Sequence, residues 1–289
     1  MPALTFDAIG TGWTITTGSA LSGPVRAAID ERIQLFDATY SRFRPDSLVT
    51  KIATAGGGST FSFPPDCLAL FSLYDDLYAA TGGAVDPLVG RGLELLGYDA
   101  TYTLVPHAAG PMPHRARWPV DVLREGVTVT TRQPVVIDVG AAGKGYLVDL
   151  ITAILHDAAI TEHVIDAGGD LRHHGDQPVR VGLEHPFQPG QVIGVASLHN
   201  GALCASAVNR RAWGDGLHHI IDARTGVPTR DVAATWVVAD NAALADGLAT
   251  ALFFTDARGL SQRFRFTYVR MLSDGRAEIS PDFPGQLFT

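Results

Sequence analysis

Residues 138–149 read DVGAAGKGYLVD, a stretch that places Lys144 among glycines and alanines. Glycines let a ligand approach the backbone closely, and the residues that follow have the pattern of a helix, whose N-terminus attracts anions. A P-loop would need a glycine at position 138 and a serine or threonine at position 145, where this chain has Asp138 and Gly145. A P-loop is therefore excluded. Two interpretations stay open: an anion or metal site, or an ordinary helix-start turn with a solvated lysine.

Outward from this stretch, strands and helices mix without a regular βαβ rhythm. Alternating and β-branched runs predict strands at 11–18, 127–131, 134–138, 163–170, 179–184, 191–199, 203–207, 218–229 and 234–240. Helical spacing with proline or glycine at the ends predicts helices at 22–43, 64–83, 144–156, 241–254 and 257–264. Residues 99–118 are expected to form an exposed excursion. The mixture favours an α+β fold with a mainly antiparallel or mixed sheet flanked by helices.

Composition limits the classes of function. The 289 residues carry a net charge of -8 without a basic stripe, which argues against a nucleic-acid partner. Cys67 and Cys204 are far apart, which fits a reducing compartment. The start has neither a basic region nor a long apolar core, and no apolar run is long enough to span a bilayer. We therefore expect a cytoplasmic protein without membrane insertion. We also expect a single domain over residues 1–289, with two lobes as an alternative.

Three further stretches carry polar residues suited to chemistry. In ADGLAT, Asp246 and Thr250 lie four residues apart, so a helix would present two hard oxygen ligands for Mg²⁺ on one face. Taken alone, the same pattern also fits an ordinary exposed aspartate on an amphipathic helix. VIDAGGD ends a strand in a glycine turn beside Asp170, which suits either a ligand or a plain hairpin. In HHIIDARTGVPT, His219 is a candidate general base, although a lone histidine is more often structural.

The order of these motifs resembles the FAD:protein FMN transferase (ApbE) family over nearly the whole chain. The segments that carry the resemblance are AIGTGWTI, YSRFRPDSLVTKI, TGGAVDPLVG, DVGAAGKGYLVD, DAGGD, ASAVNRR, HHIIDARTGVP and ADGLATALF. The resemblance implies an α+β body that holds FAD in a central cleft. It also implies Mg²⁺ beside the FAD pyrophosphate, held by the Gly143 carbonyl, Asp246 and Thr250.

The same resemblance assigns the remaining site residues. The family's FAD contacts correspond to Phe43, which would stack on a ring, and to Asp86, Lys144, Asp149, Gly168, Gly169, Asp170 and Thr225. The candidate catalytic residues are His219, Asp246 and Lys144. The chain departs from the family pattern at Leu88, Ala207, Asn209 and Ala223, which leaves some polar FAD or acceptor contacts of the family open here.

The implied reaction is Mg²⁺-dependent transfer of FMN from FAD to a threonine or serine hydroxyl of an acceptor flavoprotein, with release of AMP. Two other functions use the same residues. The first is an Mg²⁺-dependent FAD pyrophosphatase that yields FMN and AMP, and the second is a flavin-binding protein without catalysis.

Overall fold

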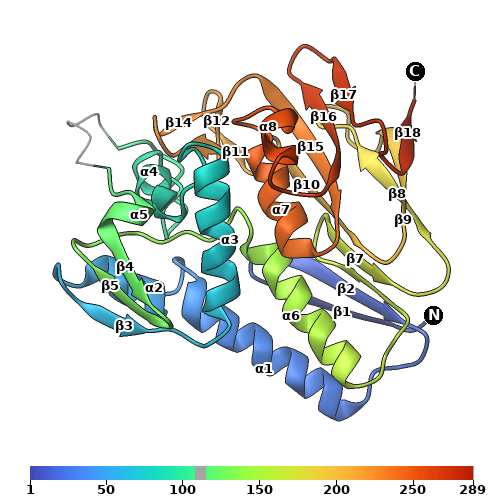
Figure 1. Ribbon diagram of the computed structural model, residues 1–289, viewed down its shortest axis with the longest axis horizontal. Coiled ribbons are helices and arrows are strands. Elements are labelled where there is room, and N and C mark those ends of the chain that lie inside the picture. The colour runs from blue at the N-terminus through green and yellow to red at the C-terminus, as the bar shows by residue number, and fades with distance from the viewer. Residues whose placement is uncertain (108–114, 289) are drawn as a thin grey trace. The chain divides into compact units, whose positions relative to one another are not determined.

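The computed structural model describes residues 1–107 and 115–288 (Figure 1). They fall into two compact units. Unit 1 contains Met1–Ile33, Ala142–Arg210 and Arg230–Thr289, and unit 2 contains Gln34–Ala141 and Arg211–Thr229. Each unit has its own antiparallel sheet. The prediction of a single domain over residues 1–289 stays a prediction.

Unit 1 is built on an antiparallel sheet in the order β1-β2-β6-β7-β10-β15-β16-β17. Its strands are Ala3–Ala8 (β1), Thr11–Thr17 (β2), His163–Asp166 (β6), Asp170–His174 (β7), Ala202–Ala207 (β10), Val232–Ala239 (β15), Thr267–Leu272 (β16) and Ala277–Ile279 (β17). Nearly every residue of β15 is buried, as expected for an apolar inner strand covered on both faces.

Helices α6 (Gly143–Asp157) and α7 (Ala242–Ala251) pack against each other and on this sheet (Figure 1). A second sheet, in the order β18-β9-β8, packs through a shared apolar core that includes Leu183, Trp236 and Val269. Its strands are Val179–Glu184 (β8), Val192–Leu198 (β9) and Gly285–Leu287 (β18). Helix α8 (Ala257–Ser261) and the first part of α1 (Gly23–Tyr40) also belong to unit 1.

Unit 2 combines short helices with a sheet in the order β3-β5-β4. Its helices are Leu48–Thr54 (α2), Cys67–Ala80 (α3), Pro87–Val89 (η1), Gly90–Leu95 (α4) and Trp118–Asp121 (α5). Its sheet strands are Thr60–Ser62 (β3), Val122–Glu125 (β4) and Thr128–Thr131 (β5). Two small hairpins complete the unit: Ala212–Trp213 (β11) with Leu217–His218 (β12), and Ile221–Asp222 (β13) with Val227–Pro228 (β14).

The α+β prediction with a mainly antiparallel sheet is confirmed, and one strand prediction is wrong. Residues 134–138 form no strand, although Val135 and Ile137 are buried. The run has no partner strand within residues 1–107 and 115–288, and the Asp138 N–H instead donates to the Pro87 carbonyl at 2.7 Å. Apolar burial alone does not distinguish a strand from a buried extended segment. Of the predicted excursion, residues 99–107 are exposed apart from Asp99, and residues 108–114 lie outside the described part. The prediction is wrong at Trp118, which is 1% exposed and begins α5.

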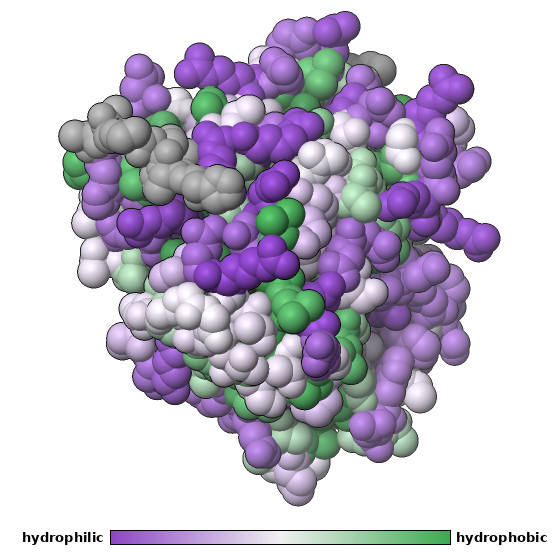
Figure 2. All heavy atoms as spheres, turned by 60° about the vertical axis from the view of Figure 1, so that its left-hand side comes forward, coloured by the Kyte–Doolittle hydropathy of each residue, from purple (hydrophilic) through white to green (hydrophobic). Residues whose placement is uncertain are grey.

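Figure 2 shows one face of the molecule, on which hydrophobic residues form separate small areas among hydrophilic ones. Isolated exposed apolar residues are normal for a folded protein and do not mark a docking patch on this face. Within residues 1–107 and 115–288, no helix is both long enough and apolar enough to cross a bilayer. The cytoplasmic location stays a prediction.

Candidate active site

Gly145 explains why the lysine motif departs from a P-loop. A Cβ atom at this position would lie 2.2 Å from the Ala242 carbonyl oxygen at the start of α7. Only glycine therefore allows α6 and α7 to approach this closely. The Gly145 N–H also donates to Asp246 Oδ2 at 3.0 Å, across 101 positions of sequence. Position 145, where a P-loop has serine or threonine, thus holds a glycine that permits close contact between two helices. Its N–H also fixes the Asp246 carboxylate.

One ammonium and two buried carboxylates meet beside this contact. Lys144 forms an ion pair with Asp170 Oδ2 at the start of β7. Asp170 is fully buried and Asp246 is 4% exposed. Burial and the neighbouring Asp170 charge raise the pKa of Asp246 well above its usual range. Burial opposes the charge on Lys144, but Asp170 and Asp246 outweigh it, so the pKa of the lysine is raised.

The glycine turn between β6 and β7 sets the position of Asp170. Gly168 and Gly169 have φ angles of 63° and 105°, which favour glycine. A Cβ atom on Gly168 would lie 2.1 Å from Thr11 Oγ1, so the turn also needs a bare backbone there. The Ala167 N–H donates to the Asp170 carbonyl at 2.9 Å and closes the hairpin. The hairpin interpretation is therefore confirmed, and the hairpin brings a buried carboxylate to Lys144, while the ligand interpretation stays a prediction.

The residues predicted for Mg²⁺ provide a suitable set of donors. Asp246 and Thr250 lie one turn apart on α7, and Gly143 is the first residue of α6. All three offer hard oxygen atoms. Asp170 and Asp246 face the single ammonium of Lys144, so a divalent cation would offset charge that the protein leaves in excess. These residues fit the ion, although no three histidine, cysteine or acidic side chains within residues 1–107 and 115–288 form a metal cluster.

Asp149 has a structural role that its motif did not reveal. Its two oxygens accept the Ala242 and Ala243 N–H groups at 2.9 and 2.8 Å. Asn241 caps the Leu244 N–H at 2.9 Å, so the first backbone donors of α7 are satisfied by side chains. The Asp149 carboxylate, predicted to contact FAD, therefore holds the start of the helix that carries Asp246 and Thr250.

We expect Asp149→Ala to lower the free energy of unfolding by about 2 kcal/mol, because two helix donors lose a charged acceptor. Urea unfolding would measure this. Asp157→Ala, an exposed change on the same helix, is the control and should leave stability unchanged. Asp149→Asn keeps an acceptor oxygen and should recover part of the loss. A stable Asp149→Ala variant that has lost only FAD binding would contradict this role.

In unit 2, Phe43 is already stacked. Its ring lies parallel to that of Tyr102, with centroids 5.0 Å apart and planes inclined by 8°, while the Arg42 guanidinium lies 4.2 Å from the Phe43 centroid. Tyr102 is 52% exposed, whereas Phe43 packs against a buried cluster. The ring open to a further planar group is therefore Tyr102, which sequence reasoning missed because it lies in the irregular segment after Asp99.

Arg42 was also missed, although it lies inside the SRFRPDS motif. Its Nε donates to Asp138 Oδ2 at 2.5 Å, and its Nη1 donates to the Tyr98 carbonyl at 2.9 Å. Burial alone would raise the pKa of Asp138, but Arg42 outweighs burial and lowers it. Asp138, which stands where a P-loop has glycine, is thus the partner of a buried arginine.

Asp86 binds backbone groups within unit 2. Its Oδ1 accepts the Leu88 N–H at 2.7 Å and its Oδ2 accepts the Trp118 N–H at 3.2 Å. Burial raises the pKa of Asp86 to about 6. The predicted FAD contact therefore already has two backbone partners, which position the segment that follows the TGG turn.

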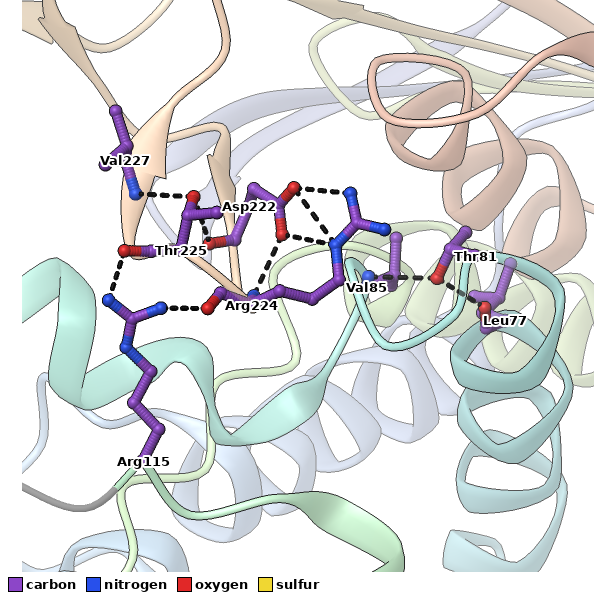
Figure 3. Close-up of polar contacts among 8 residues, drawn as sticks. All are labelled: Leu77, Thr81, Val85, Arg115, Asp222, Arg224, Thr225 and Val227. Atoms are coloured by element: carbon purple, nitrogen blue, oxygen red, sulfur yellow. Dashed lines mark hydrogen bonds and ion pairs between the residues drawn. The ribbon is translucent and has the colours of Figure 1, made fainter.

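Thr225 lies in the turn between β13 and β14 (Figure 3). Its hydroxyl accepts the Val227 N–H at 3.3 Å, and its carbonyl accepts a hydrogen bond from Arg115 (Figure 3). The neighbouring Arg224 forms a two-pronged ion pair with Asp222. The turn is thus held by two arginines, while the Thr225 side chain stays within the turn.

The adjacent histidines His218 and His219 have different roles. Both ring nitrogens of His218 are engaged, with the Thr229 carbonyl at 2.8 Å and the Ile220 N–H at 3.2 Å. His219 Nδ1 is buried and has no hydrogen-bond partner among the described residues. Burial, helped by the Arg211 charge, lowers the pKa of His219 to about 4. His219 is therefore neutral at pH 7 and holds an unused nitrogen, whereas His218 is structural.

The sequence-predicted residues thus gather in two sets. Unit 1 brings together Gly143, Lys144, Asp149, Gly168, Gly169, Asp170, Asp246 and Thr250. Unit 2 contains Phe43, Asp86, His219 and Thr225. The model of the ApbE family matches residues 9–265, which includes every one of these positions. The chain belongs to the ApbE family.

Similar proteins agree with membership of the ApbE family. The chain is 31% identical over 267 residues to a protein of Rhodobacter capsulatus named FAD:protein FMN transferase, covering 86% of this chain and 50% of that relative. It thus spans about half the length of that relative. A protein of the same name from Treponema pallidum is 29% identical over 258 residues, with 79% and 71% covered.

Solved ApbE structures confirm the fold. The ApbE protein of Thermotoga maritima superimposes with a TM-score of 0.85 at 26% identity, covering 97% of both chains. The flavin transferase ApbE of Vibrio cholerae gives a TM-score of 0.81 at 23% identity, covering 98% of this chain and 97% of that one. The ApbE-like fold expected from the sequence motifs is therefore confirmed.

Proposed function

We propose that this chain is an FAD:protein FMN transferase that moves the FMN part of FAD onto a threonine or serine hydroxyl of an acceptor protein. The observation that carries the proposal is the group of Lys144, Asp170 and Asp246 on α6, β7 and α7, in a chain that the ApbE family model spans. The relatives' names supply the reaction, and this group supplies charges suited to phosphoryl transfer.

In the proposed reaction the acceptor hydroxyl oxygen attacks the phosphorus atom on the FMN side of the FAD pyrophosphate. A new P–O bond forms, the P–O bond to the bridging oxygen breaks, and AMP leaves with that oxygen. The hydroxyl proton passes to a base, a role that we assign to His219. Lys144 offsets negative charge on the phosphates, and Asp170 holds the lysine in place. Asp246, Thr250 and the Gly143 carbonyl would hold Mg²⁺, which supplies Lewis-acid charge neutralisation when bound.

Gly143 has to serve two partners in this scheme. As the first residue of α6, its carbonyl is positioned to accept the helical hydrogen bond from residue 147. A carbonyl oxygen has two lone pairs, so it can accept that bond and still bind a cation. Asp149 contributes by fixing the start of α7, and therefore acts on Asp246 and Thr250 through the helix.

The decisive experiment incubates the chain with FAD, Mg²⁺ and an acceptor protein bearing a flavinylation site, and follows AMP release together with the acceptor mass. We expect an FMN mass gain on the acceptor and AMP release that depends on the acceptor. Equal AMP release without acceptor would favour the FAD pyrophosphatase instead. FAD that binds but stays intact would favour a flavin-binding protein without catalysis.

The role of His219 predicts a particular pH dependence. A base with a pKa of about 4 stays unprotonated between pH 8 and pH 6, so transfer should not decline over that range on account of this group. The rate should fall as the pH approaches 4, because protonation then removes the acceptor nitrogen. His219→Gln should lower kcat/KM by about 100-fold.

The pH profile of kcat/KM tests this, with circular dichroism to confirm that the chain stays folded at each pH. His107→Gln, a change of an exposed histidine in the same unit, is the control. A decline centred near pH 6.5 in the wild-type chain, or a profile that His219→Gln leaves unchanged, would exclude His219 as the base.

A further inference from the structure

Three histidines meet at the end of unit 1 where α6 finishes, and the proposed reaction uses none of them. His156 lies in the last turn of α6, His163 begins β6, and His174 ends β7. His163 and His174 are direct partners in the antiparallel register. The ring centroids are 5.4 Å apart for His156–His163, 4.9 Å for His156–His174 and 5.8 Å for His163–His174.

This spacing matches that of imidazoles around one metal ion. Three histidines that bind Zn²⁺ at about 2.0 Å have ring centres roughly 5 Å apart. The cluster is also separate from the candidate active site, because Lys144 lies three turns earlier on α6, roughly 18 Å along the helix axis. The two groups therefore need not share a ligand.

His163 is arranged as a metal-binding histidine usually is. His163 is only 1% exposed, and its Nδ1 lies 3.3 Å from the Ile160 carbonyl oxygen. A carbonyl can only accept, so this contact places the proton on Nδ1 and leaves a lone pair on Nε2. Nε2 is buried and has no hydrogen-bond partner among the described residues. An unsatisfied buried acceptor costs free energy unless a ligand uses it.

The charges around the cluster favour neutral imidazoles, the form that binds metals. Burial lowers the pKa of His163 to about 4, and the neighbouring histidines and Arg172 act in the same direction. Burial and His174 also lower the pKa of His156, while Asp157 opposes them. Lowered pKa values at His156 and His163 favour the neutral form of these two rings, which is the form that binds a cation.

We propose that His156, His163 and His174 form a site for a divalent transition-metal ion of the Zn²⁺ class. In the orientations seen here, no three such side chains within residues 1–107 and 115–288 are already arranged as a metal site. Binding therefore requires rotation of His156, which is exposed, and of His174, which is half-buried, toward the fixed His163 ring. Imidazole ligands select Zn²⁺ over Mg²⁺, so this site is distinct from the oxygen donors of Asp246 and Thr250.

Calorimetric titration of the untagged full chain with Zn²⁺ in excess Mg²⁺ tests the site. We expect one Zn²⁺ per chain, with the affinity lowered about 10- to 100-fold by His156→Ala or by His174→Ala. Both changes avoid the buried His163, so both variants should fold. His185→Ala, which removes a half-buried histidine elsewhere in unit 1, is the control and should leave the affinity unchanged.

Zn²⁺ should also raise the melting temperature of the wild-type chain more than that of His156→Ala at the same Zn²⁺ concentration. A wild-type chain that binds no Zn²⁺, or Zn²⁺ binding that neither variant weakens, would overturn the proposal. His156→Ala should still release AMP from FAD with Mg²⁺ and acceptor. The site and the transferase function therefore stand or fall separately.

Discussion

Asp246→Asn is expected to abolish acceptor-dependent AMP release while leaving the chain folded. Asparagine has nearly the shape of aspartate and can still accept the Gly145 N–H that holds α6 against α7. It removes the negative charge that would bind Mg²⁺ beside the pyrophosphate. Loss of several kcal/mol of charge stabilisation in the transition state corresponds to a decrease of roughly 100-fold or more in kcat/KM.

Stability separates this effect from simple unfolding. Burial and the Asp170 charge already raise the pKa of Asp246, so the buried carboxylate is costly in the metal-free chain. Asp246→Asn should therefore unfold in urea, without Mg²⁺, at the same or a higher midpoint than the wild type. Mg²⁺ with FAD should raise the melting temperature of the wild-type chain and not that of the variant. Asp240→Asn, an exposed change just before α7, should behave like the wild type in every assay.

If Asp246→Asn retained Mg²⁺-dependent AMP release, the metal would have to be held elsewhere. If the variant lost both activity and stability, the lost activity would follow from a disturbed fold and would not support a metal-binding role for Asp246. Only lost activity with retained stability supports the role proposed for Asp246.

Local pattern predicted most of unit 1. The run that follows Lys144 has the apolar spacing of a helix, and α6 begins at Gly143, one residue before the predicted start. The apolar run that ends at Ala239 likewise becomes the buried strand β15. In both elements the signal lies within one segment, so no knowledge of the partner segment is needed.

Contacts between distant segments could not be predicted in this way. The bond from Gly145 to Asp246 and the capping of α7 by Asp149 depend on which helix lies next to which. The motif order of the ApbE family identified the residues, but it did not reveal that Asp149 binds backbone groups. The strand prediction for the buried run at 134–138 was wrong for the same reason, because a strand forms only when a partner strand is present.

The roles of Phe43 and of the two adjacent histidines also depend on tertiary contacts. Phe43 looked like a stacking residue, yet one of its faces is covered by Tyr102 from an irregular segment. His218 and His219 are identical in type and adjacent in sequence, and only their hydrogen bonds distinguish the structural ring from the one with an unused nitrogen. Residue type limits the candidates, and tertiary contacts decide among them.

Lys144→Met is expected to destabilise the chain strongly and to abolish transfer. Methionine keeps the length of the side chain but removes the one cation that pairs with the fully buried Asp170 among the residues that the structure describes. Removing one partner of a buried ion pair costs about 3–5 kcal/mol. The Lys144 side chain is 23% exposed, so water can partly solvate the pair, and we expect a loss near the lower end, about 3 kcal/mol.

A second substitution distinguishes charge burial from catalysis. Lys144→Met combined with Asp170→Asn leaves neither charge, so much of the lost free energy of unfolding should return. Transfer should stay low in the double variant, because the positive charge beside the phosphates is still missing. Urea unfolding and AMP release, measured on the wild type, both single variants and the double variant, complete this cycle.

Each outcome of the cycle has a different meaning. Recovered stability with lost transfer supports Lys144 as a cation that both neutralises Asp170 and serves the phosphates. Additive losses of stability would show that Lys144 and Asp170 do not form a coupled pair. Recovered transfer in the double variant would show that Lys144 is needed only to neutralise Asp170, because charge beside the phosphates would then be dispensable.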